Sequence, residues 1–297
     1  MPKNKISQVV KSGKILVSDG AWGTLLHQKG LKVGECPELF CIERFDDIVD
    51  IAKSYINAGA DMVQANSFGA NSFKLEHYKL NNRVSQINEA AALASKSACS
   101  QKNWVIASMG PTGKMLITEE ITEDELYNAF KEQAVALQKG GADAACIETM
   151  SDIDEACLAI KAVKENTDLE IICTFTFEKT IRGDYKTMMG VSPTETVKAT
   201  LEAGADIVGA NCGNGFERMV DIVKEIRIVT NAPILVQANA GMPQNINGKD
   251  VFPETPEMMA NMVPKLILAG VNIIGGCCGT TPEHIKAIRQ AVDNYTK

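Results

Sequence analysis

A glycine that follows a helical run and precedes a short apolar run recurs four times along the 297 residues. The four segments read NAGADMVQAN, KGGADAACIE, EAGADIVGAN and LAGVNIIGG. A glycine in this position adopts the left-handed conformation that ends a helix, and the short turn after it leads into a buried strand. The recurrence therefore predicts a repeating unit in which helix and strand alternate.

Eight short apolar runs have the composition of parallel strands that are buried on both faces. They cover residues 15–19, 61–66, 104–108, 144–148, 171–175, 206–211, 234–239 and 272–276. Helical patterns lie between them, so the chain predicts a (β/α)₈ TIM barrel, with residues 1–297 as a single domain. An open doubly wound sheet is the alternative, although the first strand lacks the Gly-x-Gly-x-x-Gly turn that is typical of it.

Three helix starts have recognisable capping signals. Thr122 with Glu125, and Ser192 with Glu195, have the spacing of a capping box. Thr281 precedes a proline that suits the first turn of the last helix. These signals support the helical part of the repeat.

Composition excludes several classes of function. The net charge is −7, and the basic residues are scattered, so nucleic acid is not expected as a partner. The first 20 residues lack the apolar run of a signal peptide, and no segment approaches the length of a membrane span. Nine cysteines is an odd number, and several fall inside predicted helices or strands, which is typical of reduced thiols. We expect a cytoplasmic protein.

Loop lengths and polar residues indicate one end of the barrel as the site. The connections leaving the strands are long at 20–42, 177–191 and 240–255, whereas those entering the strands are short. Barrel enzymes place their chemistry at the carboxyl ends of the strands. Five predicted strands end there in a polar residue, namely Asp19, Asn66, Glu148, Asn211 and Asn239.

Three cysteines follow two of these strands. Cys212 follows the sixth strand in GANCGNG, and Cys277 and Cys278 follow the eighth in GGCCG. A closed barrel brings all three to one rim, where three thiolates suit a zinc ion. Adjacent strand residues point to opposite faces, so the pair can share one ion only if the strand has already ended.

Other readings of the thiols exist. A buried cysteine is usually an inert apolar residue, and we interpret the other six in that way. A vicinal disulfide between Cys277 and Cys278 is a second alternative, although it is strained. His284, near the pair, is interpreted as a capping or surface residue.

Three protein ligands leave a fourth position open, as in catalytic zinc sites. Zinc with three thiolates carries a net negative charge, so it is a poor activator of water but a good carrier of another thiolate. The predicted chemistry is attack by a bound substrate thiol on an alkyl group.

Five motifs resemble those of the zinc-dependent homocysteine S-methyltransferases. They are DGAWGT at 19–24, GPTG at 110–113, GANCGNG, QANAGMP and GGCCGTTPEHI. The likeness covers essentially the whole chain and is greatest to the homocysteine-binding module of cobalamin-dependent methionine synthase. It implies transfer of a methyl group to homocysteine, giving methionine.

The resemblance also implies roles for individual residues. Cys212, Cys277 and Cys278 would bind Zn²⁺, with Asn239 as the fourth ligand until substrate displaces it. Glu148 and Asp19 would hold the substrate's ammonium group, and backbone N–H groups near Gly20 and Ala21 its carboxylate. Ser67 would also contact substrate.

The methyl donor is not specified by the sequence. The chain contains no recognisable cobalamin-binding or folate-binding module, so we expect methylcobalamin, or another methylated corrinoid, on a separate protein or module. Alternatives are methyl transfer between a corrinoid protein and another thiol or methylated compound, and a non-catalytic zinc module that docks a corrinoid protein.

Overall fold

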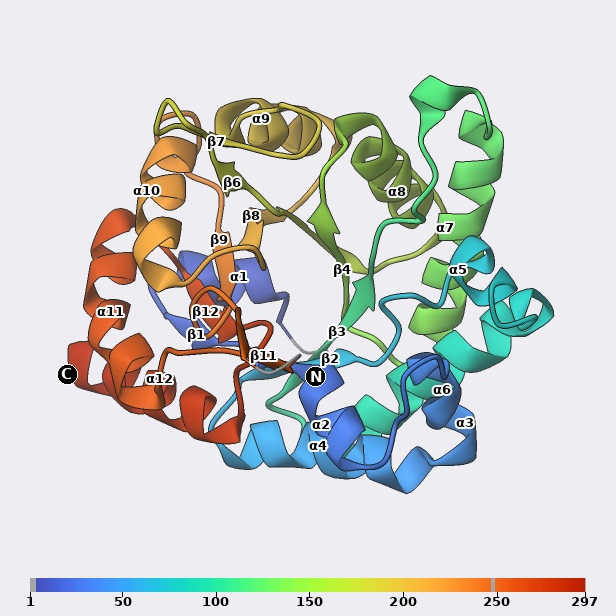
Figure 1. Ribbon diagram of the computed structural model, residues 1–297, viewed down its shortest axis with the longest axis horizontal. Helices are drawn as coiled ribbons and strands as arrows, with labels where there is room; N and C mark the ends of the chain where they lie inside the picture. Colours follow the sequence, from blue (N-terminus) through green and yellow to red (C-terminus); the bar gives the residue numbers. More distant parts are fainter. Residues whose placement is uncertain (1–3, 247–248, 297) are drawn as a thin grey trace.

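The computed structural model describes residues 4–246 and 249–296, in which eight parallel strands form one curved sheet surrounded by helices (Figure 1). Neighbours in the sheet follow the order β1-β12-β9-β8-β5-β4-β3-β2. The strands are β1 Leu16–Val17, β2 Met62–Ala65, β3 Trp104–Met109, β4 Ala144–Met150, β5 Glu170–Phe175, β8 Ile207–Asn211, β9 Ile234–Ala238 and β12 Ile273–Gly276. The predicted (β/α)₈ barrel is confirmed, and the open doubly wound sheet is wrong.

Side chains close the barrel between β1 and β2, which form no regular ladder. The N–H of Asp61 donates to the carbonyl of Val17 at 2.7 Å, and the carboxylate of Asp61 accepts from Val17 N at 2.8 Å. Higher up, Asp19 Oδ2 accepts from the backbone N of Gln64 at 2.7 Å. Two carboxylates therefore replace part of the strand pairing, which a search for apolar strands does not reveal.

Eight long helices of the described residues pack around the sheet, as the repeat predicts. They are α4 Phe45–Asn57, α6 Val84–Ala98, α7 Glu123–Lys139, α8 Ile153–Asn166, α9 Pro193–Ala203, α10 Phe216–Arg227, α11 Pro256–Ala269 and α12 Pro282–Tyr295. The outward-facing strand residues and the inner helix faces form the main hydrophobic core. Among the described residues, no helix combines the length and the apolar character that crossing a membrane requires.

The predicted helix starts are confirmed. Thr122 with Glu125 begins α7 with a capping box, and Ser192 with Glu195 begins α9 in the same way. Thr281 caps α12 together with His284, whose Nδ1 lies 3.2 Å from the backbone N of Thr281. His284 is thus a capping residue, but it is buried rather than on the surface, because its ring also contacts the carbonyl of Glu254.

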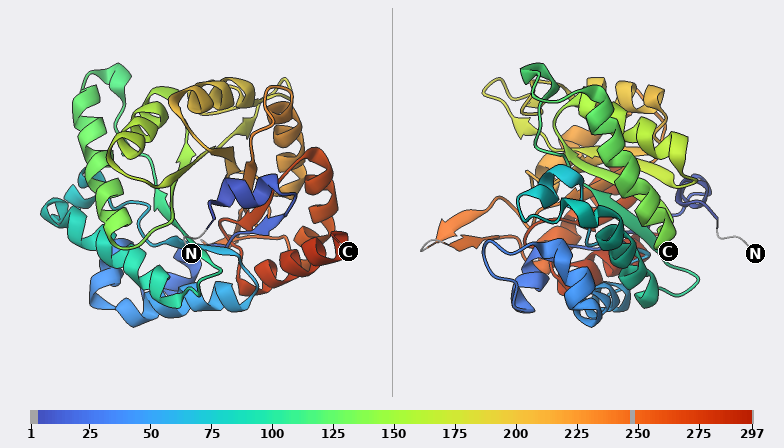
Figure 2. Two further views of the ribbon diagram at one scale, coloured as in Figure 1. Left: turned by 180° about the vertical axis from the view of Figure 1, so that it is seen from behind. Right: turned by 90° about the vertical axis from the view of Figure 1, so that its right-hand side faces the viewer.

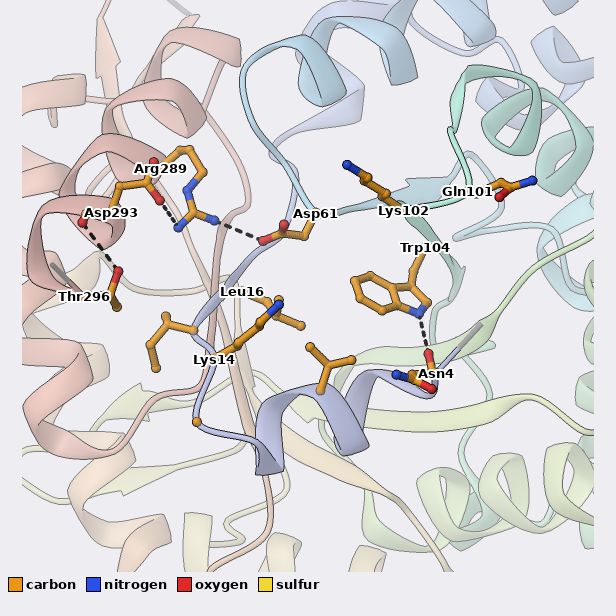
Figure 3. A pocket seen from close by; sticks show the side chains of 13 residues that line it. Asn4, Lys14, Leu16, Asp61, Gln101, Lys102, Trp104, Arg289, Asp293 and Thr296 are labelled. Atoms are coloured by element: carbon orange, nitrogen blue, oxygen red, sulfur yellow. Dashed lines mark hydrogen bonds and ion pairs between the residues drawn. The ribbon is translucent and has the colours of Figure 1, made fainter. Parts of the chain in front are cut away.

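An unpredicted helix, α1 Ile6–Lys11, covers the amino-terminal end of the barrel (Figure 2, left). Ile6 and Val10 pack against the residues that fill the barrel interior. The ring nitrogen of Trp104 donates to the carbonyl of Asn4 at 3.1 Å at the edge of an adjacent pocket of about 610 Å³ (Figure 3). On the opposite side of this pocket, Arg289 pairs with Asp61 and Asp293.

Glu170 attaches α1 to the barrel, and its removal should destabilise the protein. Its buried carboxylate accepts from the backbone N of Ile6 at 2.7 Å and of Ser7 at 2.8 Å, which are orphan donors at the helix start. We expect Glu170→Ala to lower the free energy of unfolding by roughly 2–3 kcal/mol in urea denaturation. Glu178→Ala, at an exposed position, should change it by less than about 0.5 kcal/mol. Equal stabilities of the two variants would contradict this role.

Two long connections at the carboxyl end of the barrel contain small antiparallel hairpins. The first pairs β6 Glu178–Lys179 with β7 Tyr185–Lys186, and the second pairs β10 Gln244–Ile246 with β11 Lys249–Val251. Both project on the side of the molecule opposite α1 (Figure 2, right). The remaining long connection, between β1 and α4, contains the short helices α2 Trp22–Gln28 and α3 Phe40–Glu43.

Candidate active site

A cavity of about 560 Å³ lies at the carboxyl end of the barrel strands. Its wall combines apolar side chains from the loops, such as Trp22, Phe68 and Phe252, with polar groups from the strand ends. Seven of the predicted site residues line it, namely Gly20, Ala21, Ser67, Glu148, Cys212, Cys277 and Cys278. The fold therefore brings together residues that lie as much as 258 positions apart, from Gly20 to Cys278.

The three predicted cysteines form one cluster. The sulfur of Cys278 lies 3.9 Å from the sulfurs of both Cys212 and Cys277, and all three sulfurs lie within 4.8 Å of one another. A tetrahedral zinc with bonds of about 2.3 Å places its sulfur ligands about 3.8 Å apart. The cluster thus has the donor type and spacing that zinc requires. A vicinal disulfide is absent from the structure, because Cys277 and Cys278 are both free thiols.

Backbone geometry directs the two neighbouring thiols to one side. Strand β12 ends at Gly276, so the alternation of a strand no longer applies at Cys277 and Cys278. The N–H of Cys277 donates to the carbonyl of Ala238 at 2.7 Å, and Gly279 then turns the chain with a φ of 79°. Cys212 itself has a φ of 58°, an unusual value for a residue with a side chain, and its N–H donates to Gln237 O at 2.9 Å.

Hydrogen bonds between the sulfurs affect their pKa values in opposite directions. Donation from Cys277 and Cys278, more than any other effect, lowers the pKa of Cys212 to about 3. The same contact with Cys212 raises the pKa of Cys278 to about 11, and it raises the pKa of Cys277 as well. These contacts therefore favour the thiolate at Cys212 over a thiolate at Cys277 or Cys278. A divalent metal ion would be needed to hold all three as thiolates.

Glu148 is a buried carboxylate in the cavity wall. Both of its oxygens accept from Gln64 Nε2 at 2.9 Å, and the hydroxyl of Ser108 donates to one of them. The next residue, Thr149, has a φ of 60° and is held by the side chain of Asn211 at 2.8 Å. Asn211 thereby fixes the turn that follows Glu148, which explains why a polar residue ends β8.

The burial of Glu148 should make the stability of the protein depend on pH. Burial raises the pKa of Glu148 from 4.5 to about 7, and that of Asp19 from 3.8 to about 6. The folded state thus holds these protons more tightly, so the contribution of these two groups to stability is greatest at low pH, and it falls as pH rises through about 4 to 6 for Asp19 and about 4.5 to 7 for Glu148. For Glu148 the free energy of unfolding should fall by on the order of 3 kcal/mol.

Urea denaturation at pH 5 and pH 7.5, with chelator and reductant present, would measure this loss. Glu148→Gln should remove the change in the free energy of unfolding that is due to Glu148, while the change that is due to Asp19 remains. The same pH dependence in both proteins would show that Glu148 does not titrate in this range.

The other predicted residues lie close to the cavity in different roles. Asp19 is fully buried beneath it and accepts from Trp22 Nε1 at 2.9 Å as well as from Gln64. The hydroxyl of Ser67 donates to the carbonyl of Ser108 at 2.7 Å, and the N–H of Ala21 donates to Thr280 Oγ1 at 3.0 Å. These bonds orient the site, and the predicted substrate contacts of these residues remain predictions.

Asn239 lies beside the thiol cluster. Its Oδ1 accepts from the backbone N of Cys278 at 3.1 Å, and its side chain also contacts Cys212. Service as a fourth metal ligand would require this oxygen to leave or share the N–H of Cys278. Asn66, in contrast, holds the loop above the cavity through the carbonyl of Pro37 at 2.8 Å.

Sequence reasoning missed two glutamines in the cavity wall, Gln64 and Gln237. Each occupies an inward-facing position in an otherwise apolar strand, MVQA and ILVQA. A glutamine inside an apolar strand could have indicated a site residue, because a buried amide needs hydrogen-bond partners. Thr280, which bonds both Ala21 and the carbonyl of Cys277, was also missed.

A barrel that gathers a three-thiol cluster and a buried carboxylate in a cavity at the carboxyl ends of its strands has the layout of a barrel enzyme. Comparison with known families is more specific. The model of the homocysteine S-methyltransferase family matches residues 16–292, and the chain belongs to this family of methyltransferases.

Individual relatives agree with the family. The chain is 27% identical to a methionine synthase of Mycobacterium tuberculosis and 28% identical to one of Mycobacterium leprae, over 97% and 94% of its length. It spans only about a quarter of the length of each of these relatives, 25% and 24% respectively.

Solved structures support the fold. The metallated form of the homocysteine methyltransferase MmuM from Escherichia coli superposes with a TM-score of 0.80 at 20% identity, covering 97% of this chain and 99% of that one. A methyltransferase from Methanosarcina mazei gives a TM-score of 0.64 at 11% identity, covering 98% of both chains. At these identities, the likeness establishes a shared fold.

Proposed function

We propose that this chain binds homocysteine, activates its sulfur as a zinc thiolate, and transfers to it a methyl group from a methylated corrinoid carried on a separate protein or module, giving methionine. The observation that carries the proposal is the cluster of Cys212, Cys277 and Cys278 beside Glu148 in one cavity. Family membership and the names of the two methionine synthases support the same reaction.

The donor set fits zinc. Three sulfurs supply soft ligands, with that of Cys278 3.9 Å from each of the other two and all three within 4.8 Å of one another, and none of them is tied in a disulfide. Zinc held there would lower the pKa of an incoming thiol while leaving its sulfur nucleophilic. The cluster opens into the cavity, so the substrate's sulfur can reach it without any rearrangement of the barrel strands.

The remaining groups of the chain would orient the amino acid. Glu148 would hold the α-ammonium group. Its pKa is about 7, and an ammonium group beside it would lower this pKa, so the carboxylate would be ionised at neutral pH when substrate is bound. Backbone N–H groups near Gly20, at the entrance to α2, would hold the carboxylate. Trp22, Phe68 and Phe252 line the cavity with apolar surface, which would favour a single alignment of sulfur and methyl group.

The reaction is an in-line displacement. The sulfur of homocysteine forms a new bond to the methyl carbon while the bond between that carbon and its carrier breaks, and the electron pair of the broken bond remains with the carrier. The thiol proton leaves before attack, since only the thiolate is an effective nucleophile. No residue of the chain needs to form a covalent intermediate.

Turnover with homocysteine and free methylcobalamin tests the proposal. Methionine formation that depends on zinc would support it. A zinc-containing protein without turnover under these conditions, but with affinity for a corrinoid protein, would favour the docking-module alternative. Parallel assays with other thiols identify the acceptor, which the site geometry alone does not define.

Glu148→Ala should weaken homocysteine binding much more than it weakens zinc binding. A charge-assisted contact in a partly apolar cavity contributes about 1.5–3 kcal/mol, so the Kd should rise roughly 10- to 100-fold. Isothermal titration gives the affinity, and metal analysis gives the zinc content. Glu155→Gln is a matched control, because Glu155 is a buried carboxylate bonded to Thr112 outside the cavity. Unchanged homocysteine affinity in Glu148→Ala would exclude the ammonium contact.

A further inference from the structure

Gln237 carries an unpaired acceptor inside the cavity wall. It lies on β9, opposite Asn211 of β8 and Gly275 of β12, and its side chain is 2% exposed. Its neighbours Val236 and Ala238 face the helices, so Gln237 faces the barrel interior. Its Oε1 is buried and has no hydrogen-bond partner among the described residues. A buried amide oxygen in this state is costly unless a ligand or water donates to it.

A chain of hydrogen bonds fixes which end of the amide is left without a partner. Gln237 Nε2 donates to Ser18 Oγ at 3.1 Å, and Ser18 Oγ donates to Asp19 Oδ1 at 3.2 Å. An ionised carboxylate only accepts, so the hydroxyl proton of Ser18 is used on Asp19. Ser18 must therefore accept from Gln237, and a flipped amide would lose this bond. Oε1 is thus the end left free for a donor.

The lack of a side chain at Gly275 leaves room for this arrangement. A Cβ atom at Gly275 would lie 2.7 Å from Ser18 Cβ and 3.2 Å from Gln237 Cγ. Any larger residue would push Gln237 away from Ser18. The position of the amide is therefore built into three adjacent strands, β1, β12 and β9.

We propose that Gln237 is a substrate-binding residue whose Oε1 accepts a hydrogen bond from the α-ammonium group of the substrate. This inference rests on the proposed function. An amino-acid thiol that binds as a thiolate keeps only one hydrogen-bond donor group, its ammonium. Glu148 offers that group a charge and Gln237 offers a neutral, directional acceptor on the same cavity. Together they would select α-amino thiols over simple thiols.

Affinity for two ligands tests the inference in the zinc-loaded protein. One ligand is homocysteine, and the other is 4-sulfanylbutanoate, which lacks only the amino group. The measured quantity is the Kd of 4-sulfanylbutanoate divided by the Kd of homocysteine. Gln237→Met removes the acceptor at similar volume and should lower this ratio roughly tenfold, the effect of one hydrogen bond to a charged group, with the affinity for 4-sulfanylbutanoate nearly unchanged. A ratio equal to that of the wild type would overturn the inference.

Two further variants separate this role from a structural one. Ser18→Ala removes the support of the amide but keeps Oε1, so the ratio should stay closer to the wild-type value than in Gln237→Met. Gln237→Glu keeps an acceptor and should preserve or raise the ratio, whereas a fall to the Gln237→Met value would contradict the inference. If Gln237→Met fails to fold, the Gln237→Glu result still decides. Failure of the wild-type protein to bind either thiol would instead refute the proposed function.

Discussion

Purified protein should contain about one zinc ion per chain after dialysis, and replacing any one of Cys212, Cys277 or Cys278 by alanine should remove most of it. The three sulfurs lie within 4.8 Å of one another. Among the described residues, no His, Asp or Glu side chain joins this group of potential metal ligands. Losing one of three leaves a two-sulfur site, too few protein ligands for a stable zinc centre. We expect zinc affinity to fall by several orders of magnitude, which metal analysis and competition with a chromogenic chelator would measure.

A fourth cysteine provides the matched control for this experiment. Cys157 is half-buried on α8, away from the cluster, and its sulfur donates to the carbonyl of Ala199 at 3.8 Å. Cys157→Ala should therefore keep full zinc content. Retention of full zinc content in Cys212→Ala, Cys277→Ala or Cys278→Ala would remove that residue from the site, and circular dichroism would show whether a variant that lost zinc had also unfolded.

The barrel was predictable because its signals are local and repeated. Each glycine that ends a helix is followed within a few residues by an apolar run, and the eight predicted runs all overlap observed strands. The way in which the barrel closes was harder to predict from the sequence, because it depends on hydrogen bonds that the side chains of Asp61 and Asp19 accept between β1 and β2. Helix α1 was missed for a related reason, since its start is satisfied by Glu170, more than 160 positions away, instead of by a nearby cap.

The thiol cluster was predictable in the same way, and most of the surrounding polar groups were not. Cysteines at the ends of two parallel strands must meet at one rim, so topology alone brings Cys212 near Cys277 and Cys278. A polar residue at a strand end, however, can face the cavity or support another residue. Glu148 faces the cavity, whereas Asn211 fixes the turn after Glu148 and Asp19 joins two strands. These differences depend on side-chain geometry that spacing does not encode.

The sulfur of homocysteine should dominate its binding. The analogue 2-aminobutyrate keeps the ammonium and the carboxylate but has no sulfur, so it can use Glu148 but not the metal at the cysteine cluster. We expect it to bind on the order of 100-fold more weakly than homocysteine, a difference of about 2.7 kcal/mol. Homocysteine binding near neutral pH should also release about one proton from the thiol, whereas the analogue has no thiol proton to release. Isothermal titration in buffers of different ionisation enthalpy measures both quantities.

X-ray absorption at the zinc edge decides whether the sulfur reaches the metal. Without substrate, the first shell should contain the three cysteine sulfurs and one lighter atom, for which the side chain of Asn239 is the predicted source. With saturating homocysteine the lighter atom should be replaced by a fourth sulfur, and Asn239→Ala should change only the substrate-free spectrum. An unchanged sulfur count would mean that homocysteine binds away from the metal. The zinc would then have a structural role, and the docking module would become the better account of this barrel.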